Sequence, residues 1–228
     1  MADYYAEKLS ASRLRRCYEI APPRVRRYLQ AEIDHALTKI HPGDTVLELG
    51  CGYGRIMAGL AGKAGRIIGI DTSRASLAAG RKHLASLSNC PLLQADAVRL
   101  PFPGRSFDTV LCLQNGISAF HVDPERLIEE SVRVTKPGGT VLFSSYSDRF
   151  WSHRLAWFEL QAAEGLIGEI DYEKTGAGRI VSKDGFTATT VGPAEFRRLT
   201  ASIAAVTEIY DVDDSSVFCE IIKGGVRA

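Results

Sequence analysis

The most informative stretch of the sequence is residues 46–55, which read VLELGCGYGR. An apolar run leads into glycines at positions 50, 52 and 54, and a helical pattern follows. Glycine lets the backbone turn sharply and approach a ligand closely, and the first turn of a helix has free N–H groups. A strand, a glycine-rich loop and a helix in this order indicate a site for a nucleotide-like cofactor, although such a turn can also be purely structural.

The segments on either side of this loop alternate between short apolar runs and helical patterns. We predict strands at residues 45–49, 66–70, 92–95, 109–113 and 140–143, with helices at residues 55–64, 73–87 and 124–135 between them. Alternation of this kind is typical of a parallel α/β sheet.

The flanking segments have different patterns. Before the sheet, Pro22 and Pro23 open a helix with apolar positions up to Ile40. After it, we predict a helix at residues 149–166, a hairpin at 180–191, a helix at 193–204 and two antiparallel strands within 206–223.

Composition and charge exclude several classes of protein. The chain has 228 residues, 45% of them hydrophobic, which is enough for one ordinary globular domain. A net charge of +1 disfavours a dedicated nucleic-acid binder and attachment to an acidic membrane. The apolar runs are far shorter than the roughly 20 residues that span a bilayer, and the polar N-terminus lacks a signal-peptide pattern. We therefore expect a cytoplasmic protein without a membrane partner.

Cysteine spacing gives no indication of a metal site. The five cysteines are scattered and include no C-x-x-C pair; they are Cys17, Cys51, Cys90, Cys112 and Cys219. Neither a zinc site nor a disulfide framework is predicted, so we expect small buried thiols and no metal.

Two acidic residues follow predicted strands. Asp71 ends the second strand, 21 residues after Gly50, where a carboxylate can accept hydrogen bonds from both hydroxyls of a ribose. Asp96 ends the third strand, and we expect the two carboxylates to converge on one crevice at the carboxyl edge of the sheet. Each aspartate taken alone could instead cap the following helix.

The loop also discriminates between cofactors. A dinucleotide fingerprint, G-x-G-x-x-G, requires glycine where this chain has Arg55. Glu48 would repel a pyrophosphate but would suit a ligand with an ammonium and a sulfonium group. The pattern favours S-adenosylmethionine over a nicotinamide dinucleotide. The alternatives are a nicotinamide-dependent oxidoreductase and a non-catalytic module that binds S-adenosylmethionine.

Several ordered motifs carry a family resemblance: ELGCGYG at 48–54, GIDTS at 69–73, ADA at 95–97, FD at 107–108 and RVTKPGG at 133–139. With them the chain resembles class I S-adenosylmethionine-dependent methyltransferases, especially the small-molecule branch that includes the ubiquinone and menaquinone C-methyltransferases.

The resemblance implies an α/β fold: a Rossmann-like three-layer sandwich with a seven-stranded, mostly parallel sheet whose last strand is antiparallel. The length and the change of pattern after the sheet predict one domain, with a helical N-terminal segment (1–41), a cofactor-binding core (42–146), a cap insertion after strand five (147–191), and a final helix with two strands (192–228).

The resemblance also implies roles for individual residues. The loop residues Gly50, Cys51, Gly52 and Gly54 would surround the methionine moiety, with Glu48 near its ammonium. Asp71 would hold the ribose. The remaining cofactor contacts would come from Thr72, Asp96 and Ala97 around the adenine and from Leu113 and Gln114 beside the methionine chain. The product would be S-adenosylhomocysteine.

The acceptor is expected to be a small molecule. His121 follows strand four and is the candidate catalytic base, although a surface or helix-capping role is the more common one for a histidine at such a position. The candidate substrate-binding residues are Tyr5, Tyr18, Asn115, Phe150 and Trp157. In the predicted helix 149–166, Trp151, Leu155, Phe158 and Ala162 form one apolar stripe, interpreted as core. Phe150 and Trp157 form a second surface that would line the acceptor site or make a homodimer contact.

Overall fold

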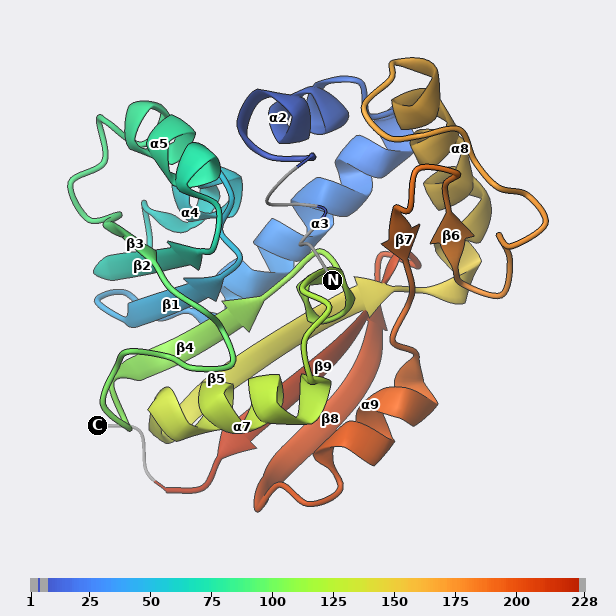
Figure 1. The fold of residues 1–228 in the computed structure, drawn as a ribbon. Coiled ribbons are helices and arrows are strands. Elements are labelled where there is room, and N and C mark those ends of the chain that lie inside the picture. The colour runs from blue at the N-terminus through green and yellow to red at the C-terminus, as the bar shows by residue number, and fades with distance from the viewer. Residues whose placement is uncertain (1–3, 5–7, 226–228) are drawn as a thin grey trace.

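A seven-stranded sheet forms the centre of the computed structural model, which describes residue 4 and residues 8–225 (Figure 1). The strand order is β3-β2-β1-β4-β5-β9-β8. The strands are β1 (Thr45–Leu49), β2 (Arg66–Asp71), β3 (Leu92–Gln94), β4 (Phe107–Cys112), β5 (Thr135–Tyr146), β8 (Ala205–Val212) and β9 (Ser216–Lys223). β1 to β5 are parallel, while β9 lies antiparallel between β5 and β8. The predicted mostly parallel sheet with an antiparallel last strand is confirmed.

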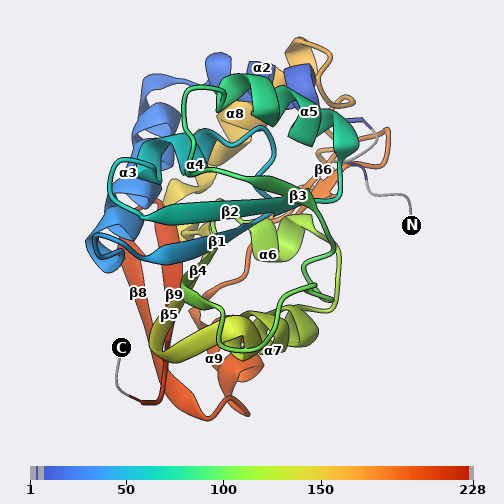
Figure 2. The ribbon, with the colours of Figure 1, turned by 90° about the vertical axis from the view of Figure 1, so that its left-hand side faces the viewer.

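Helices cover both faces of the sheet (Figure 2). One face carries α3 (Pro23–Lys39), α4 (Arg55–Leu60) and α5 (Arg74–His83), and the other carries α7 (Pro124–Val134) and α9 (Pro193–Thr200). In β4, Val110 faces the α7 side and Leu111 the α4 side, as strand alternation requires. The three-layer prediction is therefore confirmed. Among the described helices, none combines the length and apolar character needed to cross a membrane.

The start of β5 differs from the prediction. The strand begins at Thr135 and includes the segment KPGG, with a register shift opposite Phe107 to Thr109. Asp108 ties this region to β1, because its Oδ2 accepts hydrogen bonds from the Thr45 N–H and from Lys136 Nζ, both at 2.9 Å. Asp108 therefore joins neighbouring strands, away from the carboxyl edge.

The segment after β5 lies beyond the carboxyl ends of the central strands (Figure 1). It contains the short helix η1 (Asp148–Phe150), α8 (Trp151–Ala163) and a hairpin of β6 (Ile180–Val181) and β7 (Thr187–Ala188), and it packs with α2 (Ala11–Glu19). The interpretation of the apolar stripe was wrong in part: Phe150 and Trp157 are 0% and 5% exposed, whereas Trp151 and Leu155 are only partly buried. The cause is that α2 and α3 cover the Phe150 and Trp157 side of the helix.

Candidate functional site

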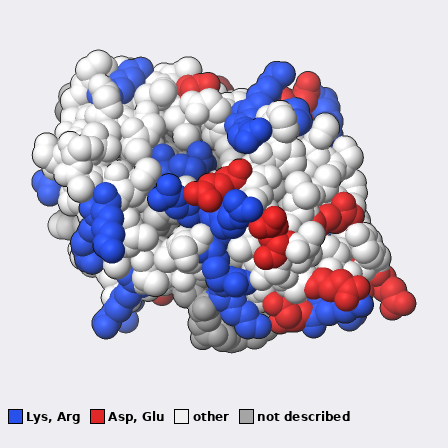
Figure 3. Space-filling model, turned by 90° about the horizontal axis from the view of Figure 1, so that it is seen from above, with Lys and Arg blue, Asp and Glu red and all other residues white. Residues whose placement is uncertain are grey.

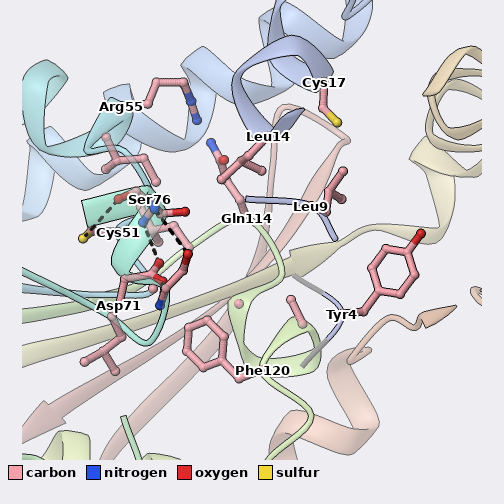
Figure 4. Close-up of a pocket in the computed structure, with 18 of the residues that line it drawn as sticks. Tyr4, Leu9, Leu14, Cys17, Cys51, Arg55, Asp71, Ser76, Gln114 and Phe120 are labelled. Atoms are coloured by element: carbon pink, nitrogen blue, oxygen red, sulfur yellow. Dashed lines mark hydrogen bonds between the residues drawn. The ribbon is translucent and has the colours of Figure 1, made fainter. Parts of the chain in front are cut away.

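A cavity of about 770 Å³ lies between the carboxyl ends of the central strands and the segment formed by α2, α8 and the hairpin (Figure 4). Its volume is within the range of small-molecule sites. At one end its wall is the glycine loop after β1, together with the ends of β2 and β4. At the other end the wall is made mainly by aromatic side chains from α2, α3, β5 and α8.

The glycine loop has a backbone that side chains disfavour. Gly50, Gly52 and Gly54 have φ values of +69°, +54° and +84°, all in the left-handed region. A Cβ atom at Gly50 would lie 2.4 Å from the Phe120 ring, so the glycine permits a close approach across the cavity wall. The sequence prediction of a sharply turned loop is therefore matched by the geometry.

Asp71 fixes this loop from the end of β2. Its Oδ2 accepts a hydrogen bond from the Gly52 N–H, and its Oδ1 accepts one from the Ser73 N–H, both at 2.8 Å. A carboxylate has about four acceptor sites, so it can accept further hydrogen bonds from a ligand. Asp71 thus connects the loop to the cavity, of which it is a lining residue.

At the glycine-loop end of the cavity, three polar side chains contain buried atoms without a hydrogen-bond partner among the described residues: Glu48 Oε2, a terminal guanidinium nitrogen of Arg55 and Gln114 Nε2. They come from β1, α4 and the segment after β4. In Figure 4 the Arg55 and Gln114 side chains extend toward the same part of the cavity. Unpaired buried polar groups are few in native proteins, so a cluster of them needs a physical explanation.

The charges of this cluster are complementary to a zwitterion. Burial raises the pKa of Glu48 to about 8, and the nearby Arg55 guanidinium partly opposes this shift. The Arg55 guanidinium lies 4.7 Å from the centre of the Tyr18 ring. Glu48 can accept hydrogen bonds from an ammonium group, while Arg55 and Gln114 can donate to a carboxylate.

The structure brings most of the predicted site residues together around the cavity. The lining includes these predicted positions: Glu48, Gly50, Cys51, Gly52, Asp71, Thr72, Ala97, Leu113, Gln114, His121, Tyr18 and Trp157. Positions from β1, β2, the segment after β4, α2 and α8 therefore meet at one edge of the sheet. His121 is exposed, at the end of the wall formed by α6 (Gly116–Ala119) and Phe120.

Four predicted residues lie outside the lining. A Cβ at Gly54 would face Leu84, and Asp96 is exposed and accepts a hydrogen bond from the Val98 N–H at 3.0 Å. Asn115 is buried between Thr189 O and Ser145 Oγ, at 2.9 and 2.7 Å. Phe150 is fully buried. The expected convergence is thus seen for Asp71 and for the two neighbours of Asp96, Ala95 and Ala97, but Asp96 itself is not a lining residue. Tyr5 lies outside the described residues.

Sequence reasoning missed several lining residues, notably Arg55, Tyr28, Phe120, Tyr146 and Gln161. At Arg55 the dinucleotide fingerprint indicates only an absent glycine, although a cation directly after a glycine loop is itself a signal of an anionic ligand group. Tyr28 and Tyr146 had no local signal, because each is one aromatic residue in an otherwise ordinary helix or strand.

Comparison with known proteins supports the resemblance to methyltransferases that the sequence motifs predict. Residues 46–139 match the family model described as "Methyltransferase domain". A demethylmenaquinone methyltransferase of Clavibacter sepedonicus is 34% identical over 105 residues, which cover 46% of this chain and 42% of that protein. The chain spans about half the length of the curated relatives it matches.

Two solved structures share the fold. The PH0226 protein of Pyrococcus horikoshii has a TM-score of 0.68 and 21% identity, covering 98% of this chain and 99% of that one. A structure titled "DhpI-SAM-HEP complex" has a TM-score of 0.63 and 24% identity, covering 96% and 94%. The resemblance to methyltransferases that the motifs predict is confirmed, because residues 46–139 match the methyltransferase-domain model and the relatives are methyltransferases.

Proposed function

We propose that this chain, with its methyltransferase domain, binds S-adenosylmethionine and transfers the methyl group to a small molecule. The observation that carries the proposal is the cluster of unpaired buried atoms on Glu48, Arg55 and Gln114 beside the glycine loop. An amino acid group, with one ammonium and one carboxylate, would satisfy all three. A pyrophosphate would instead meet the carboxyl group of Glu48.

The residues present therefore fit the cofactor. Glu48 would accept hydrogen bonds from the ammonium, and Arg55 and Gln114 would donate to the carboxylate. Asp71 would hold the ribose hydroxyls, and Thr72 and Ala97 would flank the adenine. The sulfonium supplies an activated methyl group when the cofactor is bound.

The rest of the reaction requires alignment and exclusion of water. The aromatic end of the cavity suits both tasks, because Trp157 is 5% exposed and Tyr28 is fully buried. An acceptor held there would face the glycine loop across the cavity. His121 is positioned to accept a proton at the cavity wall, and its catalytic role stays a prediction. Homodimer formation also stays a prediction.

The first test is binding of S-adenosylhomocysteine to the full chain, measured by calorimetry. We expect Asp71→Asn to weaken this binding by about 1.5 to 3 kcal/mol, because it weakens hydrogen bonds to a charged group. The amide keeps the size of the side chain, and circular dichroism would verify that the variant remains folded.

The second test is transfer of labelled methyl from S-adenosylmethionine to a fractionated cell extract. Labelling of a small molecule by the wild type, and much less by Asp71→Asn, is the expected result. Absence of S-adenosylhomocysteine binding would refute the cofactor assignment. Binding without any methyl transfer would indicate the non-catalytic module instead.

A further inference from the structure

We propose that the aromatic end of the cavity selects a compact, flat, uncharged acceptor that carries a hydroxyl group, and that it excludes cationic amines. This inference rests on the proposed function. We call this end the acceptor chamber and define it by Tyr18, Tyr28, Tyr146, Trp157, Phe158 and Gln161, all of which line the cavity.

The shape of the acceptor chamber favours a flat molecule. Its walls are rings held at fixed positions: Trp157 Nε1 donates to Cys17 O at 2.9 Å, and the Tyr18 and Trp157 ring centres are 6.2 Å apart. Rings of this kind pack well against the face or edge of another ring. Behind Tyr28 lies Phe150, fully buried and with its ring centre 5.0 Å away, so the chamber ends at this pair and the acceptor must be compact.

The polar groups of the acceptor chamber are neutral. Gln161 is 2% exposed and presents a carboxamide to the cavity that it lines. The Tyr28 hydroxyl is buried without a hydrogen bond of ordinary length and lies beside the Tyr146 hydroxyl. A buried polar group without a partner is unfavourable. A ligand hydroxyl, which both donates and accepts, is complementary to a carboxamide and to phenol groups.

Two guanidinium groups determine which charge on an acceptor is favourable in the acceptor chamber. The buried Arg154 lies over the rings of Tyr146 and Phe158, at 4.3 and 5.7 Å from their centres, and donates to Gly178 O and Ala188 O. Arg154 does not line the cavity, so it contacts these rings from behind the wall. Arg55 lies over Tyr18. A second cation against these rings would be repelled by the first at short range.

The lining carboxylates that could offset this repulsion lie at the other end. The buried carboxyl group of Glu32 is close to Tyr28 and Tyr146, but it does not line the cavity, and it already accepts hydrogen bonds from the Gln114 N–H and the Ser144 and Ser216 hydroxyls. Among the described lining residues, the two acidic side chains are Glu48 and Asp71, and both belong to the glycine-loop end. An ammonium group in the acceptor chamber would therefore be desolvated without a lining carboxylate to contact. The oxyanion that forms when an acceptor hydroxyl loses its proton would instead be stabilised by the guanidinium groups.

Shape-matched probes test the preference on the full chain saturated with S-adenosylhomocysteine. The probes are 2-naphthol, 2-naphthalenemethanol and 2-naphthalenemethylamine, the last cationic at pH 7, with affinities measured by NMR titration. We expect both hydroxyl compounds to bind at least tenfold more tightly than the amine. Equal or tighter binding of the amine would overturn the inference.

Two variants identify the residues responsible. Tyr146→Phe and Gln161→Met keep the volume of each side chain and should weaken 2-naphthol binding at least fivefold, while S-adenosylhomocysteine affinity changes less than twofold. The control is Tyr172→Phe, which removes an exposed hydroxyl bonded to Glu159 outside the cavity and should leave both affinities unchanged.

The readouts separate the two proposals. Retained S-adenosylhomocysteine binding together with unaltered 2-naphthol binding in both variants would refute the acceptor chamber alone. Absence of S-adenosylhomocysteine binding in the wild type would refute the proposed function, and this inference with it.

Discussion

The carboxyl group of Glu48 shows how one residue can link cofactor binding to pH. It is 3% exposed, one of its oxygens has no hydrogen-bond partner in the described part of the chain, and burial raises its pKa to about 8. In the free protein at pH 7 the group is therefore mostly a neutral acid. A bound ammonium would favour the carboxylate, so binding would lower this pKa and release a proton.

Affinity for S-adenosylhomocysteine should consequently rise with pH below about 8, with a slope approaching tenfold per unit, and then level off. Calorimetry between pH 6 and pH 8.5, in buffers of different ionisation enthalpy, would show the proton release. Glu48→Gln should bind more weakly and should lose the pH dependence. A flat pH profile for the wild type would contradict the role given to Glu48.

The free energy of unfolding should change with pH in the opposite direction from the affinity, so it should fall as the pH rises. The pKa of Glu48 in the folded protein lies above its ordinary value of 4.5. The stability associated with the neutral acid is therefore fully present below about pH 4.5 and is lost as the pH rises through 8. Glu48→Gln, which cannot ionise, should make the decline in urea unfolding curves smaller, and the part due to Glu32, whose pKa is raised to about 7, should remain.

At the scale of elements, α2 covers the cavity and contacts the segments at both of its ends. Its N-terminal Ala11 N–H donates to Ser76 Oγ of α5 at 3.2 Å, while its Arg13 donates to Gly165 O and Leu166 O after α8, at 2.7 and 2.8 Å. On the face seen in Figure 3, Lys and Arg are interspersed with Asp and Glu. The basic residues of α2 thus attach this helix to the segment after α8 and form local ion pairs, such as Arg15 with Glu19 at 2.9 Å.

Removing one of these contacts should make α2 more mobile and should leave the cofactor site intact. We expect Arg13→Met to accelerate hydrogen exchange in α2 and to lower methyl transfer at least fivefold, with S-adenosylhomocysteine affinity changed by less than about threefold, under 1 kcal/mol. Arg15→Met is the matched control, because Arg15 pairs within its own helix. Equal effects of the two variants would show that α2 does not depend on its contact with the α8 segment.

At the scale of the whole molecule, Glu32 connects the helical layer to the sheet. Its side chain is fully buried in α3; Oε2 accepts from the Gln114 N–H and Ser144 Oγ at 2.8 and 2.9 Å, and Oε1 accepts from Ser216 Oγ at 2.6 Å. One carboxyl group thus joins α3 to the ends of β4 and β5 and the start of β9. Burial raises its pKa to about 7 despite these bonds.

Glu32→Ala should lower the free energy of unfolding by about 3 kcal/mol or more, because the Ser144 and Ser216 hydroxyls would lose their acceptor and the Gln114 N–H would keep only Ser144 Oγ. Urea denaturation measures this loss. The control Glu129→Ala removes an exposed carboxylate of α7 paired with Arg126 and should change stability by about 0.5 kcal/mol or less. A loss below about 1 kcal/mol for Glu32→Ala would mean that water replaces the missing acceptor.

The sequence by itself determined the sheet, the glycine loop and the position of Asp71 at the end of β2. These features follow from short-range information: apolar periodicity, glycines that tolerate positive φ, and residues that directly end a strand. The carboxyl ends of parallel strands necessarily meet at one edge, so even the location of the site was predictable.

Only the tertiary structure decided which side chains complete the site. Glu32 lies on a predicted apolar helix face and meets Ser216, 184 positions away in the sequence, while Trp157 meets Cys17 across 140 positions. Asn115 and Phe150, both predicted for the substrate, are instead buried in contacts with Thr189 and Tyr28. Contacts of this kind depend on how helices dock and which side of each one is covered. The docking of each helix is determined by how the assembled layers pack, and the periodicity of a single segment contains no information about it.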